Sequence, residues 1–288
     1  MESFSSLDGF HQILNKYEDP RIRNWFMMPS PLPTIAITVV YLFLVKISLP
    51  AYMKDRKPYQ FKNFVFIYNF AQVIFSSWLF YGFLAGGWYS PKYSLECFEP
   101  RADKNMIFVA YMYYLSKFTE FIDTILFVLR KKDNQVTTLH LYHHCVMPIS
   151  SWLAVKYVPD STMTFLGLIN SFIHIVMYSY YMLSAFGPKM QKYLWWKKYV
   201  TVLQLIQFVL SLVNSAQAAL FGCLPTAISF WNMLQSTLFF MMFFDFYKHT
   251  YKEKKLPTKP TKSNGTAHTN GLKHIDINEN DIKCDKKL

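Results

Sequence analysis

The sequence of 288 residues predicts an all-α, polytopic membrane protein with seven transmembrane helices. Hydrophobic residues make up 52% of the chain and aromatic residues 19%, and they gather in seven long apolar runs. Runs of about 17–25 apolar residues are long enough to cross the hydrocarbon core of a bilayer. Lysine and arginine are concentrated in every second loop between these runs, which is the charge pattern of a multi-pass protein. Together these observations outweigh the two soluble domains that the length alone would suggest.

The apolar runs divide the chain into three parts. Residues 1–33 form a polar N-terminal segment without the early apolar core of a cleavable signal peptide, residues 34–247 form the membrane domain, and residues 248–288 form a basic tail. The expected spans are residues 34–49, 64–84, 106–129, 138–158, 162–185, 199–221 and 226–247. Pro148 lies inside the fourth span and is expected to kink it just after its first turns.

The charges of the loops predict the orientation in the membrane. The basic residues of the loops after the first, third and fifth spans are Lys54, Arg56, Lys57, Lys62, Arg130, Lys131, Lys132, Lys189, Lys192, Lys197 and Lys198. The alternate loops are balanced or nearly uncharged. Because basic loops stay in the cytoplasm, the N terminus should face the lumen and the C terminus the cytoplasm. The formal net charge of +12 therefore reflects cytoplasmic loops rather than nucleic-acid binding.

The tail and the cysteines carry little functional information. The tail is polar and rich in lysine, asparagine and threonine, so we expect it to be disordered. Its sequon at Asn264 would lie on the cytoplasmic side and stay unmodified. The four cysteines (Cys97, Cys145, Cys223 and Cys284) form no C-x-x-C pair, so no zinc or redox motif is visible. Cys97 and Cys223 both fall on the expected lumenal side, and whether they pair stays open.

Three histidines mark the most unusual stretch of the chain. His140, His143 and His144 lie within five residues in an apolar span, and at 3.6 residues per turn they share one helical face. A single histidine in a span is more often a hydrogen-bonded core residue. Ionisable side chains inside a membrane are rare and usually functional, so three on one face predict a site.

Polar residues also share a face in three other spans. These residues are Lys117, Glu120, Asp123 and Thr124 in the third span, Asn170, His174, Tyr178, Tyr180 and Tyr181 in the fifth, and Thr201, Gln204 and Gln207 in the sixth. A structural ion pair or hydrogen bonds between helices would also explain such positions. With the predicted orientation, however, all of these faces and the histidines fall at similar depth. We therefore expect a polar chamber in the cytoplasmic half and a closed apolar tunnel toward the lumen, which suits a ligand with a polar head and a long apolar tail.

Two kinds of chemistry fit such a chamber. Helical histidines together with Glu120 or Asp123 can bind a single iron or zinc ion, as in a metal-dependent lipid oxidase or hydroxylase, although four histidines at membrane depth are too few for a usual di-iron site. Alternatively, an imidazole can act as nucleophile or general base in metal-free acyl transfer. Cys145 is a rival nucleophile, but it points about 100° away from His144.

A receptor, channel or transporter is the third possibility, from a different class. The last span has no lysine that could bind retinal. The sequence also lacks the matching pair of Gly/Pro-interrupted spans that is typical of transporters.

Four motifs occur in order along the membrane domain. They are Lys117-x-x-Glu120-x-x-Asp123-Thr124, His140-x-x-His143-His144, His174-x-x-Met177-Tyr178-x-Tyr180-Tyr181 and Thr201-x-x-Gln204-x-x-Gln207. In this combination the chain resembles the very long chain fatty acid elongases, the condensing enzymes of the elongation cycle in the endoplasmic reticulum. The resemblance covers about residues 21–247.

The resemblance implies a reaction, a location and partners. A long-chain acyl-CoA would condense with the co-substrate malonyl-CoA to give a 3-ketoacyl-CoA, with no bound cofactor or metal. The protein would lie in the endoplasmic reticulum membrane beside the reductases and the dehydratase of the cycle, as a monomer or an oligomer and without nucleic acid. Relatives often end in a dilysine retrieval signal, but here Lys286 and Lys287 are shifted by one position, so retrieval through the tail is in doubt.

The resemblance also assigns expected roles to the polar residues. His143 is the expected acyl carrier, His140, His144 and His174 support it, and Asp123 and Glu120 orient histidines or hold Lys117. The residues expected to bind substrate are Lys117, Asn170, Tyr178, Tyr180, Tyr181, Thr201, Gln204 and Gln207.

Overall fold

The computed structural model describes residues 17–89 and 104–252, and in these residues the regular structure is entirely helical. The all-α prediction is therefore confirmed for the described part of the chain. Its α-helices are α2 (Leu32–Phe43), α3 (Leu49–Met53), α4 (Lys62–Phe83), α5 (Lys104–Thr119), α6 (Phe121–Leu129), α7 (Thr138–Tyr157), α8 (Thr164–Ser184), α9 (Lys197–Leu220) and α10 (Thr226–Tyr247). Short helical turns join several of them, such as Leu44–Ser48 between α2 and α3.

Helices occur at all seven expected spans, and five of them are long and apolar enough to cross a membrane. These five are Leu32–Met53, Lys62–Trp88, Thr164–Ser184, Lys197–Leu220 and Thr226–Tyr251. The protein is thus a multi-pass membrane protein. The other two spans coincide with α5–α6 and with α7, which contain the ionisable residues of the third span and the three histidines. The count of seven spans stays a prediction for these two segments.

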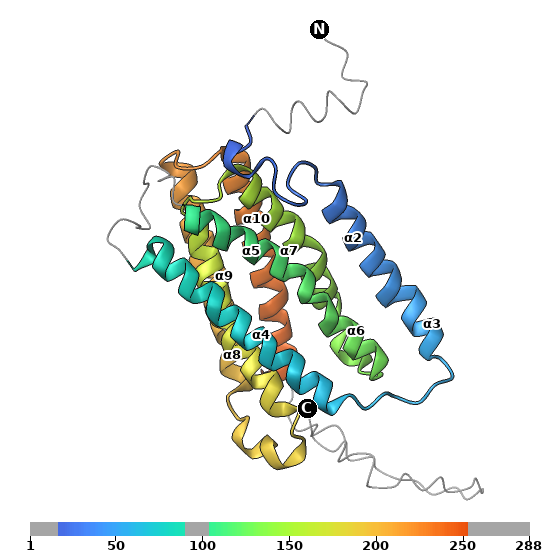
Figure 1. The fold of residues 1–288 in the computed structure, drawn as a ribbon. Coiled ribbons are helices and arrows are strands. Elements are labelled where there is room, and N and C mark those ends of the chain that lie inside the picture. The colour runs from blue at the N-terminus through green and yellow to red at the C-terminus, as the bar shows by residue number, and fades with distance from the viewer. Residues whose placement is uncertain (1–16, 90–103, 253–288) are drawn as a thin grey trace, which may run out of the picture.

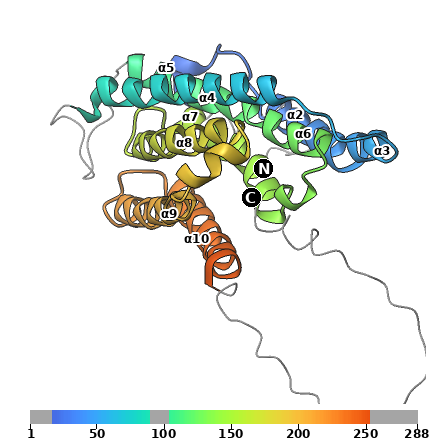
Figure 2. The same ribbon diagram turned by 90° about the horizontal axis from the view of Figure 1, so that it is seen from below.

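The helices form three layers that run roughly side by side (Figures 1 and 2). Figure 2 shows α4 and α5 on one side, α7 and α8 in the middle, and α9 with α10 on the other side. The most extensive helix contacts join α4 to α8 and α9 to α10. In the same view α2 and α3 lie at the edge of the first layer, beside α6. The middle layer is therefore covered on both faces, and it contains all four histidines expected at membrane depth.

The third span is broken at Glu120, whereas the sequence predicted one continuous helix. Helix α5 ends at Thr119 and α6 begins at Phe121. The hydroxyls of Ser116 and Thr119 donate to the carbonyls of Tyr113 and Ser116, at 2.6 and 2.7 Å. Such back-bonding competes with the backbone ladder of a helix and often bends it. Helix α7, in contrast, continues through Pro148 from Thr138 to Tyr157. The expected kink at Pro148 stays a prediction.

The described part of the N-terminal segment packs against the end of α7 that we expect to be lumenal. Trp152 donates its indole N–H to the carbonyl of Met27 at 2.9 Å, and the Lys156 ammonium donates to the carbonyl of Met28 at 3.1 Å. Lys156 also forms a fully buried ion pair with Glu18, which Arg23 contacts from the outer side. Burial would raise the pKa of the Glu18 carboxyl, but the hydrogen bonds from Lys156 and Arg23 outweigh it and lower the pKa.

Several expectations for the chain ends fall outside the described residues. These are the expectations for residues 1–16, Cys97, Cys284, the Asn264 sequon and the terminal lysines. The pairing of Cys97 with Cys223 and the disorder of the tail therefore stay open. A helical turn over Lys248–Lys252 follows α10 in the first residues of the expected tail, and the start of the tail at residue 248 stays a prediction.

Candidate active site

The three histidines of α7 lie in its first two turns, directly after a helix cap. Thr137 starts the helix, and its hydroxyl accepts from the backbone N–H of His140 at 3.2 Å. The ring centroids of His140 and His144 lie 4.2 Å apart, and those of His143 and His144 lie 5.3 Å apart. The sequence spacing therefore brings the three imidazoles together. His144 is buried and its Nδ1 has no hydrogen-bond partner among the described residues.

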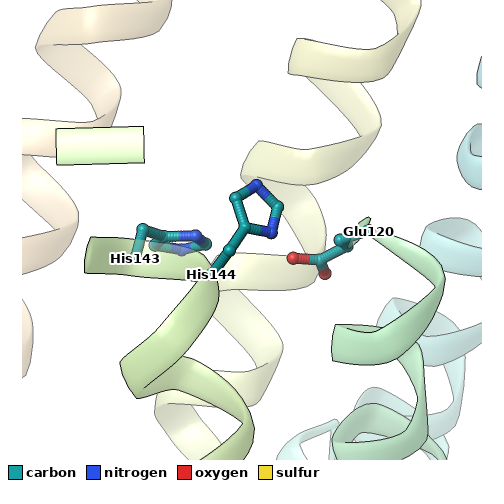
Figure 3. A group of neighbouring side chains, drawn as sticks. All are labelled: Glu120, His143 and His144. Atoms are coloured by element: carbon teal, nitrogen blue, oxygen red, sulfur yellow. The ribbon is translucent and has the colours of Figure 1, made fainter. Parts of the chain in front are cut away.

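The break between α5 and α6 places a carboxylate beside these rings. Figure 3 shows the Glu120 side chain pointing from this break toward His144. Ligand atoms of Glu120, His143 and His144 all lie within 4.8 Å of one another. His174 from α8 adds a fourth imidazole, with its Nδ1 3.4 Å from Oε1 of Glu120. Glu120 thus connects the histidines of two helices.

Lys117 neutralises the charge of Glu120. Its Nζ lies 2.7 Å from Oε1 of Glu120, and both side chains are almost completely buried. The same ammonium lies 4.2 Å from the centre of the Tyr113 ring. A buried charge needs a partner of opposite sign or a full set of hydrogen bonds. Lys117 and Glu120 are such partners for each other, so the net charge of the pair is near zero.

Asn170 joins this ion pair to two further helices. Its Oδ1 accepts from Lys117 Nζ at 3.2 Å and from the Tyr113 hydroxyl at 2.8 Å. Its Nδ2 donates to Oε1 of Gln207 at 3.3 Å. The amide therefore links α5, α8 and α9, and it shares Lys117 with Glu120.

Asp123 lies in a neighbouring polar group rather than against the histidines. Its Oδ2 accepts from the Tyr178 hydroxyl at 2.8 Å. The Tyr178 ring packs edge-on against His174, with 5.6 Å between the ring centres, and Tyr181 packs on Tyr178 at 6.2 Å. Asp123 thus holds a tyrosine that positions His174.

Three expected residues lie farther toward the expected cytoplasmic end. Gln204 contacts the sulfur of Met177 at 3.9 Å, and Tyr180 packs against Trp196 with ring centres 5.3 Å apart. Thr201 is buried in the first turns of α9. In the described residues no hydrogen bond joins these three to the histidines. The full expected set is therefore split between a cluster around Glu120 and this more distant group.

The sequence analysis missed several tyrosines and two amides. Tyr68 and Gln72 of α4 hold Thr119 at the helix break: the Tyr68 hydroxyl donates to the Thr119 carbonyl at 3.1 Å, and Gln72 Nε2 donates to the Thr119 hydroxyl at 3.1 Å. Asn69 and Gln72 are polar residues three positions apart in an apolar run, so this signal was visible.

Tyr113 lies four residues before Lys117, on the same face. Tyr41 of α2, whose hydroxyl lies 2.7 Å from Oγ1 of Thr124, gave no signal, because tyrosine is common in these spans.

A largely apolar pocket with a cavity volume of about 80 Å³ lies next to the cluster, toward the expected lumenal end. Tyr113 lines it together with Met147, one turn after His143. Its remaining lining residues include Phe83, Ala154, Val155, Val158, Met163 and Gly167. From Met147 to Val158 it extends along α7 for about 16 Å, at ~1.5 Å per residue. The mostly apolar lining suits a hydrocarbon group, whereas the closed tunnel expected from the sequence stays a prediction.

Comparisons with known proteins show the family of the chain. The ELO family, described as the GNS1/SUR4 family, matches residues 26–259. The chain belongs to the ELO family. Members of similar sequence include very long chain fatty acid elongase 7 of Drosophila melanogaster, 44% identical over 94% of this chain and 85% of its own length. Very long chain fatty acid elongase 1 of Homo sapiens is 43% identical over 86% of this chain and 92% of its own length. The resemblance inferred from the four motifs is therefore confirmed.

A metal ion is the other ligand that Glu120, His143 and His144 could hold, since each offers a suitable donor atom. The position of Lys117 argues against this use. Its Nζ lies 2.7 Å from Oε1 of Glu120, and its positive charge would repel a metal cation bound at that carboxylate. Membership of the ELO family also does not favour a metal-dependent oxidase.

Proposed function

We propose that the protein is the condensing enzyme of fatty acid elongation, joining a long-chain acyl-CoA to malonyl-CoA. The products are CO₂, free CoA and a 3-ketoacyl-CoA that is two carbons longer. The observation that carries the proposal is the cluster of histidines around Glu120, one helical turn before Met147 of the apolar pocket, in a chain of the ELO family. The polar end holds the reacting groups and the pocket holds the acyl tail.

The first step is transfer of the acyl group to a histidine. A ring nitrogen of His143 attacks the thioester carbon, the new C–N bond forms, and the C–S bond breaks to release CoA. The imidazole proton passes through neighbouring groups to the departing thiolate, so His143 becomes a neutral acyl-imidazole. His144, whose Nδ1 is unpartnered, and Glu120 lie beside the reacting ring to relay this proton.

The second step forms the carbon–carbon bond. Loss of CO₂ from malonyl-CoA leaves a carbanion, stabilised as the thioester enolate, which attacks the acyl carbon. The C–N bond then breaks, the 3-ketoacyl-CoA leaves, and His143 recovers its proton. His174, held by Glu120 and packed against Tyr178, is placed to stabilise the enolate. Lys117 and Asn170 supply N–H donors for the oxyanion on the acyl carbon.

The charge distribution supports an orientation for both substrates. Their CoA groups are anionic and belong with the basic loops at the cytoplasmic end, where Lys54, Arg56 and Lys131 lie. The N terminus would face the lumen and the C terminus the cytoplasm, in the membrane of the endoplasmic reticulum. No bound cofactor takes part, and the product would pass to the reductases and the dehydratase of the cycle.

The test is to incubate purified, metal-stripped protein with a long-chain acyl-CoA alone. We expect release of CoA and an acyl adduct that intact mass and peptide mapping place on His143. The His143→Ala variant should lose adduct and condensation. The His249→Ala variant, which changes a histidine in the helical turn after α10, should keep both. An adduct on Cys145 would overturn the nucleophile assignment. Activity that returns only with added iron or zinc would overturn the metal-free reaction.

A further inference from the structure

Helix α2 lies at the edge of the bundle, and most of its surface is apolar and exposed. Val39, Val40 and Phe43 are more than half exposed, as expected for side chains that face lipid. The opposite face is buried and unusually polar for an outer span, with Thr34, Thr38 and Tyr41 on one stripe. A span that served only as an anchor would not need this stripe.

Tyr41 reaches from α2 toward the histidine cluster. Its ring stacks on Phe121, with 4.0 Å between the ring centres and 14° between the planes. Its hydroxyl lies 2.7 Å from Oγ1 of Thr124, which has no exposed surface. The same Oγ1 lies 2.8 Å from Nε2 of His140. A continuous chain of hydrogen bonds therefore runs from α2 through α6 to the first histidine of α7.

The protons of this chain have a preferred direction. In the described residues the one hydrogen bond of the Tyr41 hydroxyl is to Thr124. If Tyr41 donates to Thr124, the Thr124 proton is free to go to His140, and every hydroxyl proton is used. If His140 donated instead, one of the two hydroxyl protons, that of Tyr41 or that of Thr124, would have no acceptor among these residues, which is unfavourable. The favoured direction requires Nε2 of His140 to be an acceptor, so its proton lies on Nδ1.

We infer that Tyr41 and Thr124 are positioning residues that hold His140 as the neutral Nδ1–H tautomer and fix the plane of its ring. His140 in turn packs on His144 at 4.2 Å, so its orientation sets that of the cluster. The first span is therefore part of the catalytic unit. This inference rests on the proposed function, because it assumes that the histidine cluster carries out the condensation.

The structure offers a matched control on the same helix. The Thr34 hydroxyl lies 2.6 Å from the Tyr114 hydroxyl, and both residues are buried. This hydrogen bond also joins α2 to the third span, through α5, but Tyr114 and Thr34 contact no histidine in the described residues. Tyr114→Phe therefore removes one buried tyrosine hydroxyl at the interface of α2 without changing the hydrogen bonds that link Tyr41, Thr124 and His140.

The experiment compares Tyr41→Phe, Thr124→Val and Thr124→Ser with Tyr114→Phe, using the full-length protein with acyl-CoA and malonyl-CoA. Tyr41→Phe should lower kcat about three- to tenfold with an unchanged KM for acyl-CoA, since one hydrogen bond is lost and the tail pocket is not altered. Thr124→Val removes the hydrogen bonds to both Tyr41 and His140 and should lower kcat more than tenfold. Thr124→Ser should keep most of the wild-type kcat. Tyr114→Phe should keep the wild-type kcat.

Equal kcat values for Tyr41→Phe and Tyr114→Phe would overturn the inference, and so would a serine variant no better than valine. A uniform loss of thermal stability in all four variants with parallel loss of activity would show a merely structural role. The His143→Ala variant separates the two proposals. If it is inactive while Tyr41→Phe matches wild type, only the positioning role fails; if it stays active, the proposed function fails.

Discussion

Lys117 and Glu120 form an ion pair with 2.7 Å between Nζ and Oε1, at a point where the helix containing them is interrupted. An i,i+3 pair on a continuous helix would be an ordinary structural contact. Here Glu120 also lies 3.4 Å from His174 and beside His143 and His144, and Lys117 also donates to Asn170. The pair thus belongs to the site as well as to the fold.

The two roles of this pair can be separated by a double substitution. Lys117→Met alone leaves a buried, unpaired carboxylate and should lower the free energy of unfolding by about 3–5 kcal/mol. Lys117→Met combined with Glu120→Gln removes both charges and should regain much of that stability, as thermal melting in detergent would show. Condensation should be lost in both proteins. A stable, active double variant would mean that the pair is only structural.

The helices were predictable because an apolar run of membrane length has few alternatives to a helix. The expected span 138–158 corresponds to α7 at Thr138–Tyr157, and the last span was expected at the bounds of α10. The break at Glu120 was not predictable from periodicity, since Lys117, Glu120 and Asp123 suit an unbroken face equally well. It depends on Ser116 and Thr119 bonding back to the chain and on Tyr68 and Gln72 holding Thr119.

Contacts between distant parts of the chain explain what else was missed. Tyr41 and Thr124 are 83 residues apart, and nothing local distinguishes Tyr41 among 20 tyrosines. The N-terminal segment was predicted to be a polar end, yet its buried Glu18 depends on Lys156, 138 residues later. The histidine cluster was found because its residues are adjacent in sequence and unusual for a span.

Because of Glu18, the stability of the folded protein should depend on pH in the acidic range. The hydrogen bonds from Lys156 and Arg23 lower the pKa of Glu18, and that from Arg21 lowers the pKa of Asp19, in each case against the effect of burial. A lowered pKa in the folded state stabilises it above the unfolded values of about 4.3 and 3.9, and this stability is lost as the pH falls through the lowered values. The melting temperature should therefore drop in this acidic range.

Glu18→Gln is the variant that checks this assignment. It removes one partner of a buried pair and should cost about 3 kcal/mol near neutral pH. Its melting temperature should also fall less between pH 6 and the acidic range than that of the wild type. A variant with the wild-type pH dependence would show that other carboxylates cause the acid sensitivity.

Asn170 should be needed for its hydrogen bonds rather than for its volume. Asn170→Leu is of similar size but leaves Tyr113, Gln207 and one N–H of Lys117 without their partner. We expect a fall in kcat of at least tenfold, because a lost oxyanion donor or a displaced Lys117 weakens charge stabilisation in the transition state. Asn214→Leu on α9 is the control, since Asn214 bonds the Thr162 carbonyl away from the histidines. Equal kcat in both variants would contradict the assigned role.

Gly167 and Phe83 should set how much acyl chain the pocket accepts. Both line the pocket, and a Cβ added to Gly167 would lie only 2.5 Å from Cζ of Phe83. Gly167→Ala must therefore displace the Phe83 ring or take up space in the pocket. Phe83→Leu should enlarge the pocket. Each methylene that loses its place forfeits about 0.8 kcal/mol of burial, roughly a fourfold preference against the longer chain. Gly167→Ala should thus favour shorter products and Phe83→Leu longer ones, as mass spectrometry of the acyl products would show.

Gly82→Ala provides the matched comparison for this effect. Its Cβ would meet Val109 at 2.7 Å, a clash of similar severity, but neither Gly82 nor Val109 lines the pocket. If Gly167→Ala changes the distribution of chain lengths and Gly82→Ala changes only stability, the shift comes from the space inside the pocket. If both variants change the distribution alike, chain length responds to general loosening of the α4 packing, and the assignment of Phe83 and Gly167 fails.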